Sequence, residues 1–590
     1  MSLKRKRLEL SVRTLDSKLK KNAFTIYENV LCLLVKDYPS DIADKVTGFL
    51  KAKDYVGLIG WADPMGGALH TTAAESRAAG QLSALIKKYP FPIPGLKAFA
   101  QNQAIEKFVT AEKQCKKYNL KLRRIHNGSS PDQSLILRKM SDFIYKVIGE
   151  EPDLPRIYDQ CSFGPGASVG VHGQLTNLGR KLLTKDWTCT PLALPYAISA
   201  MSRDQHIFEL LLKDGPFTCM DIDLFRKKMV DRVRLVHYNK IVTVPKTVLV
   251  DRTIAVEPLL NGYLQLGVDR FLKSKLNRIG IDLRDQTRNQ YLAKLGSSPG
   301  TSDPFITIDL SSASDSISYE LVRKLLPPLW MSFLSSLRST EYMLPGSDKL
   351  HSYEKFVSMG NGFCFPLETL IFASVCALYS KPNDFSVYGD DIICRQSVAK
   401  QVLKTLWRIG FRHNRKKTFL QGPFRESCGA DWFMGEDVRP LTLDYEFDSL
   451  SNIIKFHNMT KQKSFWDFRF SEVREYLRGL IPLELRFVRP YKGNVFGAFE
   501  VELDMFQSSK FSRWNRDIQA WEWTEIGLRG VPDKGLRREE RYPTALVIGA
   551  VRGLPSNGPF MKRRSTTLSV RRISYGGATS TWLPPEYRYT

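Results

Sequence analysis

The middle of the chain alternates short β-rich runs with stretches in which hydrophobic residues recur every three or four positions. Residues 363–379 carry this helical spacing, and Pro366 is tolerated near the start because first-turn amides have no helical acceptor. A second amphipathic helix is predicted for residues 398–409, with Gly410 to end it. Residues 305–309 predict a strand. The chain is therefore expected to mix α and β structure.

A β-hairpin is predicted between these two helices. Two β-prone arms within residues 385–394 surround the tripeptide Gly389-Asp390-Asp391. Gly and Asp favour turns, so ordinary turn chemistry explains this tripeptide when it is taken alone. Two adjacent carboxylates, however, repel each other unless a cation lies between them. The tripeptide is thus either a plain turn or part of a cation site.

The predicted strand ends in a further acid, Asp309. Period-two alternation places it on the face opposite Ile306 and Ile308, so we expect Asp309 to face away from the core. If the strand end lies beside the hairpin turn, Asp309 and Asp390 converge on two hard divalent cations, with Asp391 as an auxiliary. Two ions about 3.5–4 Å apart suit nucleotidyl transfer, because one activates a 3′-hydroxyl and the other neutralises the leaving pyrophosphate.

Composition narrows the class of partner. The 590 residues include 87 Lys and Arg against 61 Asp and Glu, a net charge of +26 that points to a polyanion. Hydrophobic residues make up 43% of the chain, which excludes a mainly disordered protein. The first 21 residues and residues 551–590 are both rich in basic side chains. These charges either keep the ends of the chain exposed to water or attract phosphates.

Cysteines, histidines and apolar runs exclude other classes. The nine cysteines are odd in number and never spaced C-x-x-C, and the eight histidines form no H-E-x-x-H, so neither a disulfide framework nor a zinc site is predicted. Glu9 and Arg13 interrupt the apolar stretch that a signal peptide needs after its basic start. There is no run of about 18 apolar residues. We expect a soluble protein of a reducing cytosol.

Three motifs occur in order along the chain, in residues 309–318, 358–362 and 388–391. With them, the sequence resembles the replicase subunit of single-stranded RNA bacteriophages, the levivirus group that includes Q-beta. Further stretches similar to that family are residues 242–246, 283–290 and 422–429, with a looser match at 161–167. The resemblance spans about residues 160–440.

The resemblance implies an α+β fold, a right-hand polymerase of fingers, palm and thumb whose palm is an antiparallel sheet carrying the Gly-Asp-Asp hairpin. We expect the N-terminal region and fingers in residues 1–300, with part of the palm there as an open alternative, the palm with the catalytic motifs in 301–440, and the thumb and C-terminal region in 441–590. The implied activity is that of an RNA-directed RNA polymerase that copies a phage genome from ribonucleoside triphosphates, with two Mg²⁺ or Mn²⁺ ions. The implied place is the cytoplasm of the infected bacterium, and the implied partners are the host elongation factors Tu and Ts and a ribosomal RNA-binding protein.

The resemblance also assigns roles to residues. Asp309 and Asp390 are metal ligands, with Asp391 beside them. Asp315 pairs with Asn361 to sense the ribose of the incoming nucleotide, where the 2′-hydroxyl separates RNA from DNA substrates. For Asp315 the open alternative is a helix cap. Ser358 is a second candidate for the same ribose contact.

Basic residues have implied roles at the phosphates. Lys246 and Arg252 are expected on a fingers hairpin that binds the triphosphate, with exposed surface charge as the alternative. Either Lys416 or Lys417 protonates the departing pyrophosphate. Residues 426–429 resemble the hairpin that borders the palm and supports the nascent 3′ end, with a purely structural role as the open alternative. Gly360 and Gly362, on either side of Asn361, suit a backbone that closely approaches template or nucleotide, or a simple turn. Pro366 stands at a position where the family is expected to have an acidic residue.

Residues beyond 440 align with no motif. Aromatic and basic side chains interleave at residues 511–516 and continue to Trp521 and Trp523, which suits either base stacking or a hydrophobic core.

Three rival functions are weighed against the polymerase. Residues 166–170 fit the G-x-S-x-G of a serine hydrolase, with His172 nearby, but lack a strand before and a helix after. A reverse transcriptase shares the palm and acids, and usually has a bulkier residue at the position of Gly389. An RNA-binding module without activity is the third.

Overall fold

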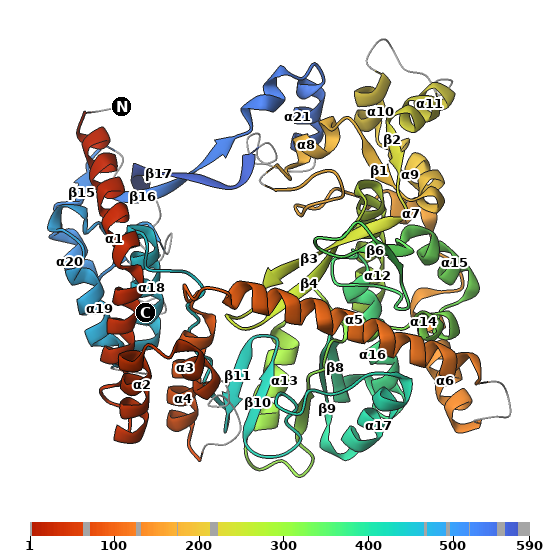
Figure 1. The fold of residues 1–590 in the computed structure, drawn as a ribbon, viewed down its shortest axis with the longest axis horizontal. Coiled ribbons are helices and arrows are strands. Elements are labelled where there is room, and N and C mark those ends of the chain that lie inside the picture. Colours follow the sequence, from red (N-terminus) through yellow and green to blue (C-terminus); the bar gives the residue numbers. More distant parts are fainter. Residues whose placement is uncertain are drawn as a thin grey trace.

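The computed structural model describes residues 3–62, 71–125, 131–173, 175–212, 222–464, 469–490, 496–517, 520–551 and 561–575 (Figure 1). Residues 552–560 and 576–590 of the basic C-terminal stretch, and Cys219, lie outside these ranges. None of the helices in the described ranges combines the length and the apolarity that crossing a bilayer requires. The eight cysteines in these ranges are free thiols.

The carboxylate hairpin belongs to a three-stranded antiparallel sheet. β5 (Phe305–Ile308) pairs with β9 (Asp391–Arg395), and β9 pairs in turn with β8 (Phe385–Tyr388). Ile308 lies opposite Ile392 in the register of β5 and β9. Asp309 follows β5 directly, so the end of that strand lies beside the hairpin turn, as the sequence predicts.

Helices cover both faces of this sheet. Ile306 and Ile308 belong to the main hydrophobic core, whereas Phe305 packs with Ile393 against α13 (Thr287–Ser297) on the other face. Thr307, which shares a strand face with Asp309, is only 2% exposed. Asp309 itself is half-buried and belongs to neither hydrophobic cluster, so it faces away from the main core as expected, although α13 adds a second apolar layer on its side of the strand.

Two further helices form where the three-and-four spacing predicts them. α16 (Cys364–Ala377) packs against β8 and α12 (Leu259–Arg278) and is buried along nearly its whole length. α17 (Ala399–Ile409) ends at Gly410, which takes the left-handed conformation with φ of 115°. The hairpin lies between these two helices in the sequence, and α16 packs against its first strand.

A second sheet lies beside the first and has the order β4-β3-β6-β7. β3 (Tyr238–Pro245) and β4 (Asp251–Val256) form an antiparallel hairpin, and β6 (Glu341–Met343) and β7 (Leu350–Ser352) complete the sheet. The long helix α5 (Leu96–Arg123) crosses it and contacts β4 and α14 (Tyr319–Leu325) (Figure 1). α15 (Pro328–Leu337) follows α14.

The remaining elements frame these sheets. The N-terminal helices are α1 (Leu3–Val35), α2 (Ser40–Ala52), α3 (Tyr55–Ala62), α4 (Ala73–Lys88) and α6 (Pro131–Ile148). Those between α6 and β3 are α7 (Leu154–Tyr158), α8 (Leu178–Leu183), β1 (Trp187–Cys189), α9 (Leu194–Met201), α10 (Gln205–Leu212), α11 (Ile222–Arg232) and β2 (Val233–Leu235). The C-terminal elements are β10 (Phe424–Ser427), β11 (Ala430–Phe433), β12 (Glu436–Asp437), α18 (Leu450–Ser464), α19 (Arg469–Gly479), β13 (Val488–Arg489), β14 (Phe499–Glu500), α20 (Leu503–Gln507), β15 (Ser512–Asn515), β16 (Ala520–Pro532), α21 (Tyr542–Val551) and β17 (Met561–Tyr575).

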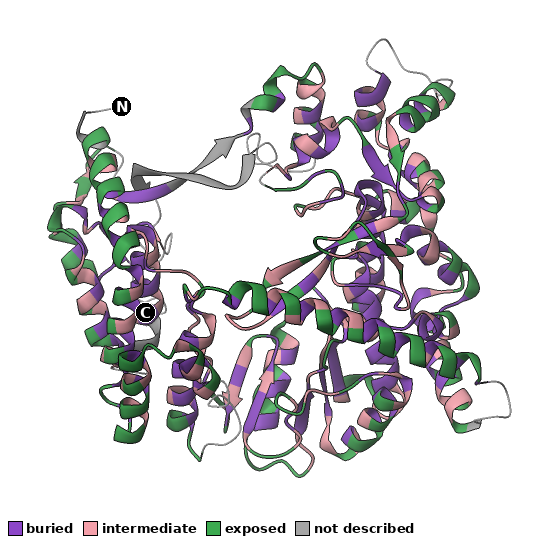
Figure 2. Ribbon diagram, in the orientation of Figure 1, coloured by how far each residue is buried: buried purple, intermediate pink, exposed green. Residues whose placement is uncertain are grey.

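Two large hydrophobic cores hold these elements together. The main core joins buried residues between 122 and 411 with three residues near α21, namely Leu536, Ala545 and Ile548. The second core joins residues 12–91 with residues 443–526, which are far apart in the sequence. Figure 2 shows the resulting buried interiors, with exposed residues along the outer sides of α1, α2 and α5. The three-part division at residues 300 and 440 stays a prediction.

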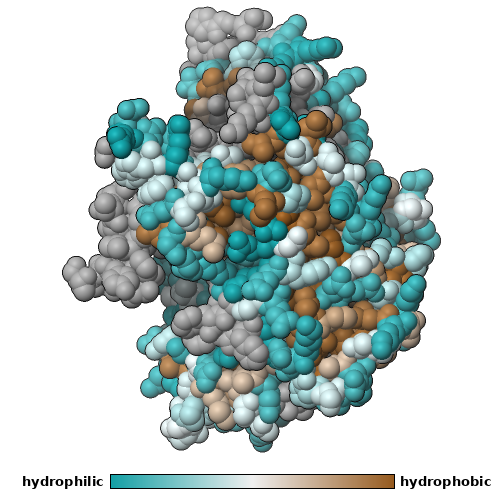
Figure 3. Space-filling model, turned by 90° about the vertical axis from the view of Figure 1, so that its left-hand side faces the viewer, coloured by the Kyte–Doolittle hydropathy of each residue, from teal (hydrophilic) through white to brown (hydrophobic). Residues whose placement is uncertain are grey.

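The C-terminal aromatics differ in burial, and their stacking on bases stays a prediction. Trp523 is 3% exposed and belongs to the second core, whereas Trp514 of β15 is 45% exposed and packs edge-on against Trp521. Figure 3 views the side on which α1 and α20 lie in Figure 1, and hydrophobic patches alternate there with hydrophilic ones. Other exposed apolar side chains of these elements are Leu10 and Met505.

Candidate active site

The hairpin turn is fixed by the fit of Gly389 against α16. Gly389 has φ of 62°, and its N–H donates a hydrogen bond to Thr369 Oγ1 at 3.0 Å. A Cβ at this position would lie 2.3 Å from Cε2 of Phe365, which is closer than real contacts allow. The turn therefore requires glycine, and the fit places Asp390 at the tip and Asp391 at the start of β9.

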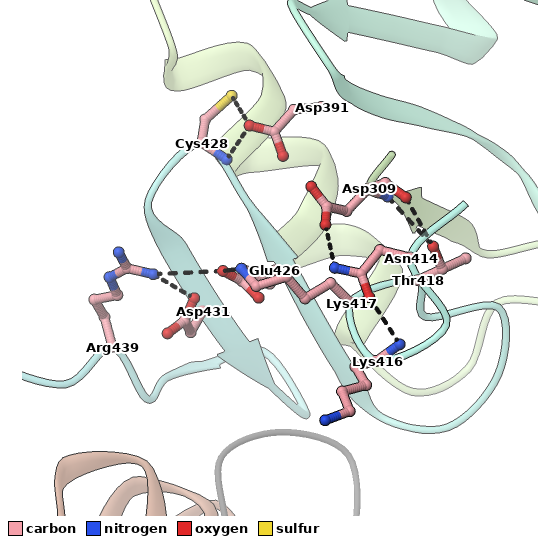
Figure 4. A network of polar contacts seen from close by, with 10 residues as sticks. All are labelled: Asp309, Asp391, Asn414, Lys416, Lys417, Thr418, Glu426, Cys428, Asp431 and Arg439. Carbon is pink, nitrogen blue, oxygen red and sulfur yellow. Dashed lines mark hydrogen bonds and ion pairs between the residues drawn. The ribbon is translucent and has the colours of Figure 1, made fainter. Parts of the chain in front are cut away.

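Asp309 is held by the segment that follows α17. Asn414 Nδ2 donates to Asp309 Oδ2 at 2.9 Å, and the Asn414 N–H donates to the Asp309 carbonyl oxygen at 2.8 Å (Figure 4). Burial raises the pKa of Asp309 above its ordinary value, the charge of Lys417 opposes this, and the charge of Asp390 adds to it. The carboxylate thus lies within electrostatic reach of both residues.

Asp391 is turned toward a neighbouring hairpin. The backbone N–H and the thiol of Cys428 donate to Asp391 Oδ2 at 3.3 and 3.5 Å (Figure 4). Burial raises the pKa of Asp391 to about 7, and the charges of Asp390 and Asp309 contribute to the increase. The structure therefore brings the three predicted acids together, close enough for their charges to act on one another.

The chemistry of these acids fits a hard divalent cation. Carboxylate oxygens are the ligands that Mg²⁺ and Mn²⁺ prefer. Burial is the main cause of the raised pKa values of Asp309 and Asp391, and a cation would relieve the mutual repulsion that adds to it. Within the ranges that the structure describes, no group of three or more His, Cys, Asp or Glu side chains is gathered as a metal site. Asp309 and Asp390 stay the predicted ligands of such an ion.

Of the two predicted lysines, Lys417 is the one beside the carboxylates. Its Nζ forms an ion pair with Glu426 Oε1 at 2.8 Å. Burial lowers the pKa of Lys417, but the charges of Glu426 and Asp309 outweigh it, so the net pKa is raised. Lys416 is exposed, and its side chain points away from Asp309 in Figure 4. Lys417 therefore stays positively charged near Asp309.

The β3–β4 hairpin brings two further cations to the same place. Lys246 follows β3, and Arg252 lies on β4 opposite Val244. Desolvation, followed by the charges of Arg252 and Lys417, lowers the pKa of Lys246, while Asp309 and Asp390 act in the opposite direction. Lys246 and Arg252 thus lie near each other, and Lys246 lies near the carboxylates.

Asp315 is bound to a lysine that the sequence analysis missed. Lys355 is fully buried, and its Nζ contacts Asp315 Oδ1 at 2.8 Å and Glu112 Oε1 at 3.3 Å. The same ammonium lies 3.4 Å from the centre of the Phe108 ring, so a cation–π contact stabilises it. Asp315 lies in a short 3₁₀ turn (Ser314–Ser316) rather than capping α14.

Asn361 and Ser358 form a separate hydrogen-bonded loop. Asn361 Oδ1 accepts from the N–H of Phe363 at 3.1 Å, and the Asn361 N–H donates to the Ser358 carbonyl oxygen. Both side chains are buried. A Cβ on Gly360 would lie 2.2 Å from the carbonyl oxygen of Ala255, so this close backbone approach is to β4. The carboxylate of Asp315 and the amide of Asn361 are thus engaged by different partners.

Glu368 of α16 is a second residue that the sequence analysis missed. It is 3% exposed, and Ser314 Oγ donates to its Oε2 at 2.7 Å. Burial and the charge of Asp390 raise the pKa of Glu368 to about 8, so the acid is mostly protonated at neutral pH. A lone acid within an otherwise apolar helical pattern was the signal for it.

The hydrolase motif does not form a nucleophile elbow. Ser168 and Val171 exchange two backbone hydrogen bonds of 2.8 Å in a tight turn, and no helix begins between residues 168 and 173. The side chain of Ser168 is also buried.

Comparisons with known proteins show the family to which this chain is similar. Residues 79–513 match the family described as RNA replicase, beta-chain. The RNA-directed RNA polymerase subunit beta of Qbeta virus (strain MX1) is 38% identical over 395 residues, which cover 65% of this chain and 63% of that protein. The RNA-directed RNA polymerase beta chain of Escherichia phage MS2 is 39% identical over 298 residues, or 50% of this chain and 51% of that one.

A solved structure is similar only in part. It is titled "In situ structure of BmCPV RNA-dependent RNA polymerase at elongation state", and it aligns with a TM-score of 0.31 and 11% identity over 52% of this chain and 29% of that one. The aligned part of this chain spans a little under two thirds of the first relatives that it matches. Because the family match covers most of the sequence and includes all three carboxylates, the chain belongs to the RNA replicase beta-chain family.

Proposed function

We propose that the chain is the catalytic subunit of an RNA-directed RNA polymerase, which copies a single-stranded RNA phage genome from ribonucleoside triphosphates. The observation that carries the proposal is the meeting of Asp309, Asp390 and Asp391 at one end of the β5-β9-β8 sheet. The family to which the chain belongs supports it, as do the polymerase names of its relatives. The hairpin would then belong to the palm of a right-hand polymerase.

The residues around the acids suit nucleotidyl transfer. Asp309 and Asp390 would hold two Mg²⁺ or Mn²⁺ ions, which when bound activate the 3′-hydroxyl and neutralise the leaving pyrophosphate. Lys246 and Arg252 bind triphosphate oxygens from the β3–β4 hairpin. Lys417 keeps its charge because of Glu426 and stabilises negative charge near Asp309. Asp315 and Asn361 contact the ribose of the incoming nucleotide, and Ser358 is a further candidate for this contact.

A reverse transcriptase is the second candidate, and the turn disfavours it. Such enzymes usually have a bulkier residue at the position of Gly389, where a Cβ would lie 2.3 Å from Phe365. The two candidates are separated by supplying an RNA template with either ribonucleotides or deoxyribonucleotides. Incorporation of ribonucleotides alone supports the polymerase assignment, and incorporation of deoxyribonucleotides contradicts it.

The decisive experiment compares two Asp→Asn changes in the full chain. Asp390→Asn should lower ribonucleotide incorporation about a hundredfold or more, because an ion ligand is lost. Asp348→Asn, at an exposed position between β6 and β7, is the matched control and should leave incorporation unchanged. RNA binding should persist in both. Full synthesis by the Asp390 variant would refute the assignment and leave a non-catalytic RNA-binding module.

The setting is proposed on the resemblance alone. The chain would act in the cytoplasm of the infected bacterium together with host elongation factors Tu and Ts and a ribosomal RNA-binding protein. Purification from infected cells under low salt, followed by identification of the co-purifying chains, tests these partners.

A further inference from the structure

A basic cavity lies where the C-terminal segment meets α8, away from the carboxylates. Its volume is about 690 Å³, which is within the usual range for a site that binds a small organic ligand. Its lining comes from the turn at residues 170–172, from α8, from α11 and from residues 539 and 541 just before α21. Figure 1 shows α8 and α21 side by side, and the two helices contact each other.

An ion pair fixes the joint that forms this cavity. Arg180 Nε and Nη2 donate to the two carboxylate oxygens of Asp533 at 2.9 and 3.2 Å. The side chain of Asp533 is only 2% exposed, so this pair is largely shielded from water on the acidic side. The two walls of the cavity are therefore held in place, although the paired residues are 353 positions apart in the sequence.

Four other cations line the cavity against two acids. Lys185 and Lys228 are exposed at its edge, and Arg232 and Arg541 are half-buried. The acids are Asp231 and Glu539. Positive charges gathered in one concave place repel one another unless an anion joins them, so the cavity is electrostatically suited to a negatively charged ligand.

Arg232 and Arg541 add to the excess of positive charge in the cavity. Arg232 Nη2 donates to the carbonyl oxygens of Leu182 and Thr184 at 2.7 Å, which orients its guanidinium over the ring of Trp187. Burial and the charge of Arg541 lower the pKa of Arg232 to about 10. Within the described part of the chain, the Nε atoms of both arginines are buried without a hydrogen-bond acceptor. The two guanidiniums are thus close, desolvated and short of negative charge.

Apolar side chains complete the lining. Leu175, Leu183 and Leu211 form part of the wall, so the cavity offers apolar surface beside the cations. A nucleotide unit of single-stranded RNA presents this combination, because its phosphate is anionic and its base has an apolar face. A free phosphate would use only the cations.

We propose that this cavity binds the phosphate backbone of single-stranded RNA at a site separate from the polymerising centre. This inference rests on the proposed function, because it takes RNA as the ligand of the chain. The bound strand bridges α8 and α11 with the segment before α21. It thereby couples RNA binding to the joint that Arg180 and Asp533 hold.

The test measures RNA affinity in the full chain with a fluorescein-labelled single-stranded 20-mer. The double variant Lys185→Glu/Lys228→Glu changes two exposed residues of the cavity edge. The double variant Lys400→Glu/Lys404→Glu makes the same charge change on exposed positions of α17 and is the matched control. Anisotropy titrations between 50 and 200 mM salt give both the affinity and its salt dependence.

The cavity variant should bind the oligonucleotide about tenfold more weakly than the control variant. Its slope of log affinity against log salt should also fall by about 1.4, because two phosphate contacts to a single strand are lost. Equal affinities and slopes in the two variants would overturn the inference while leaving the proposed function intact. If the unmodified chain incorporates no nucleotide while the cavity variant still binds RNA more weakly, the proposed function fails and the RNA site stands.

A competition experiment separates the strand from free nucleotide. Unlabelled single-stranded RNA should displace the labelled strand at far lower concentration than ATP does. If ATP displaces it equally well from the unmodified chain but not from the cavity variant, the cavity binds free triphosphate and the inference of a strand site is wrong.

Discussion

Lys355 donates to Asp315 at 2.8 Å although the lysine side chain has no exposed surface. The two residues are 40 positions apart, and Glu112 of α5 completes the ion cluster from a third segment. Burying an ammonium is costly unless the charge is paired, and here two carboxylates and the ring of Phe108 surround it. The residue proposed to contact the ribose is thus oriented by a cation in the core.

Replacing Lys355 should therefore affect both stability and substrate choice. Lys355→Met leaves Glu112 and Asp315 without their cation and should cost about 3–5 kcal/mol of unfolding free energy. Lys355→Met/Glu112→Gln, which removes one uncompensated acid, should recover part of this. Urea unfolding measures the loss of stability. Because Lys355 no longer orients Asp315, the ratio of ribonucleotide to deoxyribonucleotide incorporation should fall in the double variant. An unchanged ratio would show that Asp315 does not select the ribose of the incoming nucleotide.

Gly389→Ala should disrupt the carboxylate turn. The variant forces a side chain into left-handed backbone and against Phe365, so it should destabilise the protein by more than the roughly 1–2 kcal/mol expected for backbone strain alone. Gly346→Ala is the control, because Gly346 has φ of 72° and a Cβ added there would have no atom within 4 Å. Thermal unfolding and nucleotide incorporation measure the two effects. Equal losses in both variants would show that the contact with Phe365 is unimportant.

Glu368 should make stability depend on pH. Its pKa is raised from 4.5 to about 8 in the folded protein, so folding favours the protonated acid. The stabilisation is fully present below about pH 4.5 and is lost as pH rises toward and through 8. Glu368→Gln keeps a neutral side chain and should remove this dependence, with a gain on the order of 5 kcal/mol over the unmodified chain at pH 9. The free energy of unfolding, measured in the presence of a chelator at pH 5 and pH 9, tests this prediction. The same pH dependence of stability in the Glu368→Gln variant and the unmodified chain would contradict the raised pKa of Glu368.

Lys416 and Lys417 offer a matched pair at adjacent positions. Lys417→Met should lower the rate of nucleotide incorporation about tenfold or more, because it removes the cation paired with Glu426 near Asp309. Lys416→Met should have little effect. Single-nucleotide extension on a primed template compares the two rates. A larger loss in the Lys416 variant would reverse the assignment.

The sequence predicted those parts of the site that depend on local patterns. Alternation and turn residues predicted β5 and the hairpin, and the three-and-four spacing predicted α17. The strand-end position of Asp309 and the order of the motifs predicted that Asp309 lies near Asp390. Local patterns gave no sign that Lys355 is buried, because its acidic partners lie in distant segments. Glu368 stood out as a lone acid in an apolar helical pattern, but that pattern gave no sign of its distant partner Ser314. The second layer over β5 was missed for the same reason, since α13 contributes it.

The second core has a consequence for synthesis on the ribosome. Buried apolar side chains of residues 12–91 share this core with those of residues 443–526. At roughly 5–20 residues per second, about 20–70 s pass between translation of these two regions. During that interval the nascent N-terminal helices expose the surface that their partner will cover, which makes them natural clients for chaperones.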